Sequence, residues 1–214
     1  MIGHSRERHV TADEERGAAR SESAGAAGPE GAEDGADDPG ETAVAPPSPY
    51  ARAEALAEQG SHAEAAEAYA ALLSVSPDDV RALLGAGTAL AALNRYDAAE
   101  KELRRALRLA PDLPEVHHQL GVVLFKRGVY SAAATELRRA VELDPSSGAA
   151  YLVLGEALNQ MAESDQAIEA LENAARLHPE NARAYWAMGI AYDRKGNPDR
   201  AAEMYRMSRD VGGR

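Results

Sequence analysis

Residues 114–145 read PEVHHQLGVVLFKRGVYSAAATELRRAVELDP, and the same arrangement of residues recurs on both sides of this stretch. A proline closes each copy, and successive prolines are 34 residues apart: Pro77, Pro111, Pro145 and Pro179. An apolar residue followed by glycine recurs in the same phase, at Ala86-Gly87, Leu120-Gly121, Leu154-Gly155 and Met188-Gly189. Self-similarity at a fixed period of this size predicts a solenoid of stacked, similar units.

The recurring residues have physical reasons to be where they are. Glycine inside a helix costs about 1 kcal/mol relative to alanine, so four glycines in one register mark a close approach of two helices. Alanine at Ala99, Ala133, Ala167 and Ala201 serves the same purpose on a second helix. The prolines lie just past each second helix and stop it. An alanine-rich bundle without repeats would not require this unbroken spacing.

The period and pattern resemble the tetratricopeptide repeat, a helix-turn-helix unit. The match covers roughly residues 46 to 209. The resemblance implies an all-α fold, a right-handed α-solenoid of about five units, preceded by a disordered tail. We expect a repeat domain over residues 46–214, with units at about 46–79, 80–113, 114–147, 148–181 and 182–214. Turns are predicted near Gly60, Asn94, Gly128, Ala162 and Gly196.

Residues 1–45 differ in composition from the rest. They carry 4 Arg against 11 Asp plus Glu and contain no aromatic residue, in a chain whose net charge is −12. Such a segment buries too little apolar surface to offset its ordering entropy, so we expect a disordered acidic tail. Its role is either to keep the protein soluble or to fold back, through residues 30–41, onto basic residues of the repeats.

Composition also bears on partners and location. There is no cysteine, so we expect no disulfide and no thiolate metal site. The start, MIGHSRERHV, lacks the apolar run of a signal peptide, and no apolar segment is long enough to span a membrane, which predicts a cytoplasmic protein without direct membrane insertion. The acidic balance argues against nucleic acid as a partner. Abundant alanine and only three lysines suggest a bacterial source.

The resemblance also implies a binding surface. In this family the first helix of each unit lines the concave side, where ligands lie. Inward positions recur on one stripe of each first helix. Carried onto this chain, they give a partner-binding groove of Leu84, Thr88, His118, Val122, Phe125, Lys126, Leu152, Glu156, Asn159, Arg183, Trp186, Ile190 and Arg194.

Two aromatic residues distinguish this stripe. The chain has a single Trp and a single Phe, and both, Trp186 and Phe125, fall on it. Large aromatic residues at otherwise exposed positions are typical of binding hot spots, although both could simply pack between neighbouring first helices. With the mixed charges Lys126, Glu156 and Arg183 around them, they suit an amphipathic helix or an extended peptide with apolar anchors.

The remaining candidates for chemistry are weak. Neighbouring residues on a helix do not face each other, so His117 and His118 cannot bind one metal ion from the same face. His118, Glu156 and Asn159 could converge as an acid–base group, but no nucleophile, phosphate loop or cofactor motif accompanies them. We therefore expect no metal, no cofactor and no enzyme activity. The sequence predicts a protein-interaction adaptor in a multiprotein complex or, alternatively, a self-associating structural protein that forms homo-oligomers.

Overall fold

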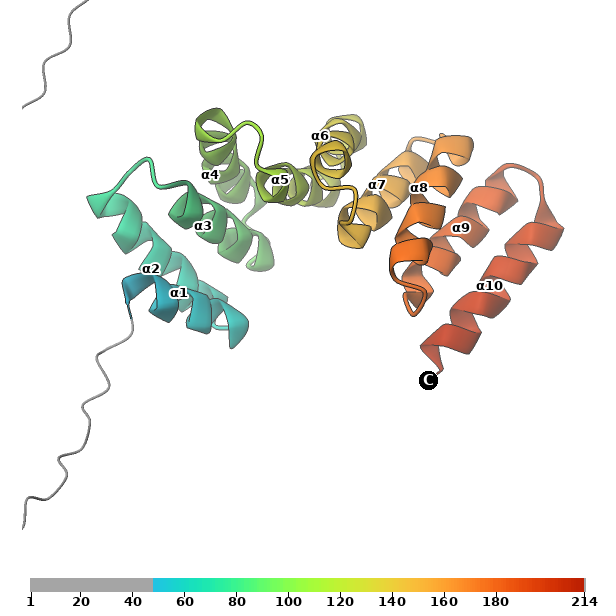
Figure 1. The fold of residues 1–214 in the computed structure, drawn as a ribbon, viewed down its shortest axis with the longest axis horizontal. Helices are drawn as coiled ribbons and strands as arrows, with labels where there is room; N and C mark the ends of the chain where they lie inside the picture. Colours follow the sequence, from blue (N-terminus) through green and yellow to red (C-terminus); the bar gives the residue numbers. More distant parts are fainter. Residues whose placement is uncertain (1–47, 214) are drawn as a thin grey trace, which may run out of the picture. The chain divides into compact units, whose positions relative to one another are not determined.

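The computed structural model describes residues 48–213. Within them the fold consists of ten α-helices and no strand (Figure 1), as the all-α solenoid prediction requires. The predicted disordered tail lies outside the described residues. The helices are α1 (Pro49–Glu58), α2 (His62–Val75), α3 (Val80–Ala92), α4 (Tyr96–Leu109), α5 (Pro114–Lys126), α6 (Tyr130–Leu143), α7 (Gly148–Gln160), α8 (Ser164–Leu177), α9 (Ala182–Arg194) and α10 (Pro198–Gly212).

Polar side chains cap several of these helices at their N-termini. Ser48 Oγ accepts a hydrogen bond from Ala51 N at 3.2 Å at the start of α1, where Pro49 is the first helical residue. Asp79 Oδ1 accepts from Ala82 N at 2.9 Å at the start of α3. Side chains of this type satisfy backbone N–H groups that have no partner within the helix. The caps therefore help fix where the helices begin.

The turn inside each helix pair needs one residue in the left-handed backbone region. The five residues are those predicted from the sequence: Gly60, Asn94, Gly128, Ala162 and Gly196, with φ between 58° and 79°. Glycine adopts this conformation without a steric penalty, whereas a Cβ atom makes it costly. The turn at Ala162 is consequently the one whose residue type fits least well.

The repeated glycines let a large side chain of the second helix lie directly on the first. A Cβ atom at Gly121 would lie 2.5 Å from Leu137 Cγ, closer than real carbon contacts allow. Leu103 and Leu171 cover Gly87 and Gly155 in the same way. All three leucines are completely buried. The close approach predicted from the glycine register is therefore confirmed.

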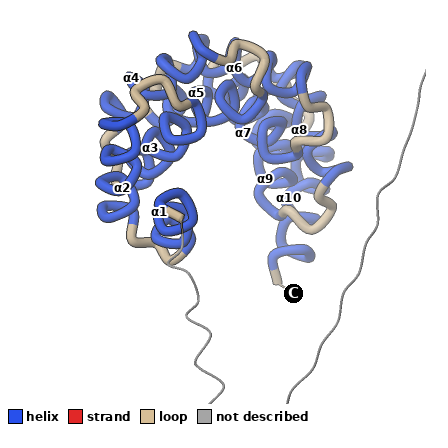
Figure 2. Tube along the Cα trace, turned by 60° about the vertical axis from the view of Figure 1, so that its left-hand side comes forward, coloured by secondary structure: helices blue, strands red, loops and turns tan. Residues whose placement is uncertain are grey.

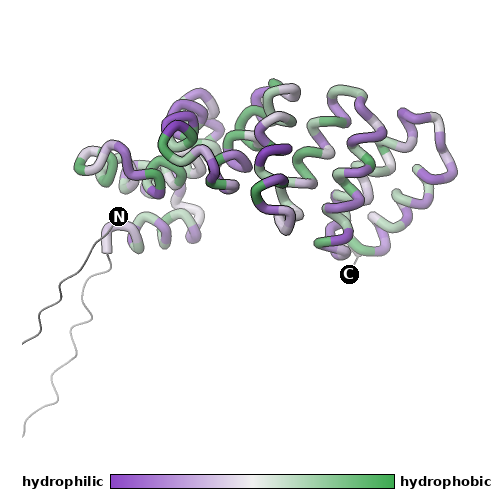
Figure 3. The backbone as a smooth tube through the Cα atoms, turned by 45° about the horizontal axis from the view of Figure 1, so that its top comes forward, coloured by the Kyte–Doolittle hydropathy of each residue, from purple (hydrophilic) through white to green (hydrophobic). Residues whose placement is uncertain are grey.

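The helices form two layers. Figure 2 shows the odd-numbered helices on the inner side of a curve and the even-numbered helices on its outer side. Each odd helix contacts the next odd helix, whereas within residues 48–213 the even helices make no comparable contacts with one another. Figure 3 shows hydrophilic and hydrophobic residues interspersed along the helices, as expected where only part of each helix is buried. The inner layer is therefore continuous, and the outer layer has gaps.

The two ends of the described solenoid depart from the common pattern. Position 24 of the unit, elsewhere leucine, is Tyr69 in the first unit and Tyr205 in the last. The ring of Tyr69 lies over Gly85, where any side chain would collide with it. At the other end, Ser208 Oγ donates a hydrogen bond to Ala182 O at 2.8 Å, which ties α10 to the start of α9.

Candidate partner-binding groove

A hollow on the inner side of the curve brings together seven of the predicted groove residues. Its volume is about 290 Å³, and α5, α7 and α9 contribute its walls. We call it the inner hollow; it is lined by Phe125, Glu156, Asn159, Gln160, Arg183, Trp186, Ala187, Ile190 and Arg194. The structure thus places the single Trp and the single Phe of the chain in one site, although they are 61 residues apart (186 − 125).

Trp186 is the most exposed aromatic group in this hollow. Its side chain is 53% exposed, and its ring centroid lies 4.8 Å from that of Tyr205 at an interplanar angle of 50°. Tyr205 in turn donates its hydroxyl to Asp193 Oδ2 at 2.7 Å. Burial, together with this hydrogen bond, raises the pKa of Tyr205 to about 12. The ring that supports Trp186 therefore remains a neutral hydrogen-bond donor across the physiological pH range.

Sequence reasoning did not identify Tyr205, because it belongs to a second helix and the groove was assigned to first helices. A signal was nevertheless present. The same position holds Leu103, Leu137 and Leu171 in the three preceding units. The replacement of leucine by tyrosine places a second aromatic ring over Gly189, next to Trp186.

Two of the three charged side chains that line the inner hollow neutralise each other. Arg183 binds Glu156 with two hydrogen bonds, of which Nη2 to Oε2 is 2.6 Å long. Of the predicted mixed-charge rim, Glu156 and Arg183 therefore form an internal ion pair. Lys126 forms none with any residue of the described range and lies outside the hollow. Arg194, which lines the hollow, has no ion pair with any residue in the described range 48–213.

Two predicted groove residues are buried beneath the surface. Leu152 is 7% exposed and belongs to a core cluster with Leu171 and Ala184. Asn159 is 4% exposed, and its Nδ2 donates to Ala187 O at 2.9 Å, which ties α7 to α9. The helical periodicity of the sequence could not predict the burial of these two residues, because their burial depends on how closely α9 approaches α7.

The other predicted residues lie outside the inner hollow. Thr88 is exposed and donates its hydroxyl to Leu84 O, one turn earlier on α3. His118 lines a separate small hollow with Asp144 and Ser147. The remaining members outside it are Leu84 and Val122, which are half-buried, and Lys126, which is exposed. The structure therefore concentrates the candidate site on α7 and α9, with Phe125 at its edge.

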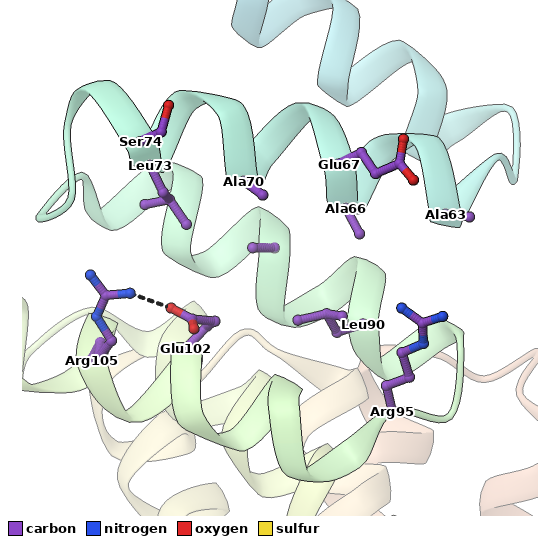
Figure 4. Close-up of a pocket in the computed structure, with 11 residues that line it drawn as sticks. Ala63, Ala66, Glu67, Ala70, Leu73, Ser74, Leu90, Arg95, Glu102 and Arg105 are labelled. Atoms are coloured by element: carbon purple, nitrogen blue, oxygen red, sulfur yellow. Dashed lines mark hydrogen bonds and ion pairs between the residues drawn. The ribbon is translucent and has the colours of Figure 1, made fainter.

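A larger hollow lies on the opposite, outer side. Its volume is about 510 Å³, and Figure 4 shows it between α2 and α4, with Leu90 of α3 at its floor. We call it the outer hollow; it is lined by Ala63, Ala66, Glu67, Ala70, Leu73, Ser74, Ala86, Leu90, Arg95, Glu102 and Arg105. No aromatic side chain lines it. The larger of these two hollows is therefore not the one that contains the residues predicted to bind a partner.

The histidines occupy separate environments. His117 is buried, with Nδ1 2.8 Å from Glu136 Oε2 and Nε2 2.8 Å from Pro111 O. One contact thus comes from α6 of its own repeat and the other from the connection that precedes α5. Across residues 48–213, no three side chains of the metal-binding types come together as a site for an ion. None of the ten helices described has the length and apolar character needed to cross a bilayer.

Comparisons with known proteins agree with this architecture. The family model described as tetratricopeptide repeat matches residues 50–114 and 160–210, and that described as anaphase-promoting complex, cyclosome, subunit 3 matches residues 93–174. No protein with a curated function matches the chain.

Several solved structures share the fold. A crystal structure of MamA is 28% identical, with a TM-score of 0.69, and the likeness covers 75% of this chain and 94% of that one. MamA from Desulfovibrio magneticus RS-1 is 27% identical, with coverage of 75% and 91% and a TM-score of 0.69. YrrB, described as a TPR protein with an unusual peptide-binding site, is 26% identical, with coverage of 74% and 82% and a TM-score of 0.65.

Proposed function

Because this chain belongs to the tetratricopeptide repeat family, we propose that it is an adaptor that holds a segment of a partner protein in its inner hollow, as one subunit of a multiprotein complex. Proteins of this family are generally non-catalytic scaffolds. The observation that carries the proposal is Trp186, a large ring that stays 53% exposed in a hollow on the concave side. Exposed aromatic anchors of this kind dominate the energy of many protein interfaces.

The surroundings of Trp186 favour binding. Its ring rests on Tyr205, which Asp193 holds in place, so little side-chain freedom remains to be lost when a partner arrives. Phe125 and Ile190 extend the apolar surface around it. The likeness to YrrB, described as a peptide-binding TPR protein, also supports a peptide segment as the ligand.

The test is a pull-down from native lysate with the full chain and a Phe125→Ala/Trp186→Ala variant. We expect one partner to be captured by the wild type and lost by the variant, with Trp186→Ala alone costing on the order of 2 kcal/mol of binding free energy. Val75→Ala serves as a control, because Val75 is an apolar residue that is 82% exposed and does not line the inner hollow. Circular dichroism of each variant checks that it is folded. Recovery of the same proteins with every variant would refute the proposal.

One observation favours the second candidate, self-association. Met207 on α10 is 36% exposed at the end of the described solenoid, where no further repeat covers it. Stacking of a second copy there would bury this side chain. Light scattering over a concentration series separates the two functions, because a strictly monomeric protein excludes self-association, whereas growth in mass that Met207→Glu abolishes establishes it.

The acidic tail has its own test. We propose that residues 1–45 keep the protein soluble and take no part in binding. Deletion of residues 1–44 should then leave partner affinity unchanged. A rise in affinity after the deletion would instead identify the tail as an internal competitor for the basic residues of the repeats.

A further inference from the structure

The amide of Asn159 is satisfied on one side only. Its Nδ2 donates to Ala187 O at 2.9 Å, and this bond fixes which way the amide faces. Its Oδ1 is buried and has no hydrogen-bond partner, and it is the one side-chain atom of residues 48–213 in this situation. Asn159 lines the inner hollow together with Glu156 and Trp186. An acceptor without a donor therefore lies at the wall of the proposed binding site.

A buried acceptor that has lost water and gained no donor destabilises the structure that contains it. A ligand that supplies an N–H group at this point removes that penalty, so the penalty becomes a source of binding free energy. The sequence left two types of ligand open, an amphipathic helix and an extended peptide, and these differ in their backbone N–H groups. The backbone N–H groups of a partner helix are already bonded within that helix, whereas an extended segment has free N–H groups along its length.

The charge of the hollow indicates a second feature of the ligand. Glu156 and Arg183 neutralise each other through their two hydrogen bonds. Arg194 lines the same hollow and has no ion pair with any of the residues that the structure describes. The hollow thus offers one free positive charge beside an apolar wall. A carboxylate next to an apolar side chain is the complementary arrangement.

We propose that the inner hollow binds an extended partner segment, which donates a backbone N–H to Asn159 Oδ1, packs an apolar side chain on Trp186 and places a carboxylate beside Arg194. This inference rests on the proposed function, and it specifies the ligand of the same site. Asn159 and the exposed Gln160 line the same hollow, and binding through Oδ1 requires that the ligand reach this buried atom from there.

The experiment uses the full chain and a phage-displayed library of random short peptides. We expect the selected peptides to combine an aromatic or aliphatic anchor with a nearby Asp or Glu. Selection on an Arg194→Glu variant should replace the acidic preference by Lys or Arg. Arg194 is exposed, so this substitution leaves the fold intact. Peptides without any charge preference on either protein would overturn the carboxylate part of the proposal.

Backbone methylation tests the hydrogen bond. Each N–H of the best peptide is replaced in turn by N-methyl, and binding is measured by fluorescence anisotropy. We expect one position at which methylation weakens binding by about tenfold. With an Asn159→Ala variant, checked for folding by circular dichroism, that position should lose its special sensitivity. Should Asn159→Ala prove unfolded, the methylation series on the wild type still decides between an extended and a helical ligand.

The failures are distinguishable. If Trp186→Ala abolishes binding but no methyl group changes affinity by more than about twofold, or circular dichroism shows the bound peptide to be helical, the extended-segment inference is wrong and the groove function stands. If the selected peptides bind Trp186→Ala as well as the wild type, or the library yields none, both the inference and the location of the proposed function are wrong.

Discussion

The outer hollow and the inner hollow differ in a way that their volumes do not show. The outer hollow is the larger, about 510 Å³ against 290 Å³ for the inner one. Yet the inner hollow holds an exposed tryptophan, an unpaired arginine and a buried acceptor without a donor, whereas alanines form much of the outer wall (Figure 4). The large volume of the outer hollow reflects its short side chains. Groups that lack a partner within the protein favour binding, and these groups lie in the smaller, inner hollow, which we therefore propose as the site.

The alanines of α2 that line the outer hollow stand where the following unit has charged residues. Ala66 and Ala70 stand 34 residues before Glu100 and Arg104, which form an ion pair of 2.7 Å on the outside of α4. In the following unit the equivalent arginine, Arg138, reaches across to Gln166 at 2.7 Å. Long charged side chains thus stand at one or both of these positions in α4 and α6. In the first unit both positions are alanine, and these short side chains line the outer hollow.

The largest expected effect is on stability and comes from a substitution of Leu152, which packs in the core and does not line the inner hollow. Leu152 was predicted to contact the partner but is buried between α7, α8 and α9. Leu152→Ala should lower the free energy of unfolding by about 2–5 kcal/mol through lost packing and a new cavity, measured by urea denaturation. A variant of unchanged stability that binds its partner poorly would contradict this and return Leu152 to the binding surface.

A smaller effect is expected from Tyr205→Leu, which restores the residue found in the preceding units. Leucine fits over glycine at this position three times elsewhere, so the unfolding free energy should change by less than about 1.5 kcal/mol. Loss of the ring under Trp186 should weaken partner or peptide binding by about 0.5–1.5 kcal/mol, measured by calorimetry. Tyr205→Phe, which keeps the ring, is the control and should bind almost as the wild type does. Equal binding by all three proteins would show that Trp186 needs no support.

The sequence predicted the fold well because the fold is a repeat. Four glycines and four prolines recur in one common register. A single alignment of the repeat therefore fixes all of them, and the turns at Asn94, Gly128 and Ala162 could be placed from the pattern alone. The site was predicted less completely, because it depends on departures from the pattern. Whether Asn159 is buried, whether Arg183 is already paired with Glu156 and whether Tyr205 supports Trp186 are decided by contacts between units, which the period does not specify.

Filling the outer hollow should have little effect. The Ala66→Glu/Ala70→Arg variant transfers the Glu100–Arg104 pair to α2, and such a pair on a helix surface changes stability by no more than about 0.5 kcal/mol. Partner affinity should be unchanged, measured beside Trp186→Ala. Ala66→Glu/Ala70→Glu is the control for charge, and its like charges should be slightly destabilising. Loss of partner binding in the ion-paired variant would reverse the comparison and make the outer hollow the site.

The smallest effect concerns His118, which was predicted to lie in the groove. It lines neither large hollow but a narrow one of about 40 Å³, with Asp144 and Ser147. Burial lowers the pKa of His118 from its ordinary value of 6.5, and the negative charge of Glu115 only partly opposes this. A histidine with a lowered folded-state pKa resists protonation, so the unfolded chain takes up the proton first. Stability should therefore fall as the pH drops below 6.5, with no contribution from this residue at higher pH.

Urea denaturation above and below pH 6.5 measures the contribution of His118 to the free energy of unfolding. The wild type should lose more stability on acidification than His118→Gln, because glutamine does not titrate, while carboxylates affect both proteins alike. Peptide affinity measured over the same pH range provides the contrast with the inner hollow, and the substitution should leave its pH dependence unaltered. If His118→Gln instead removes a pH dependence of binding and leaves that of stability untouched, His118 belongs to the partner surface, and the inner hollow extends along α5 beyond Phe125.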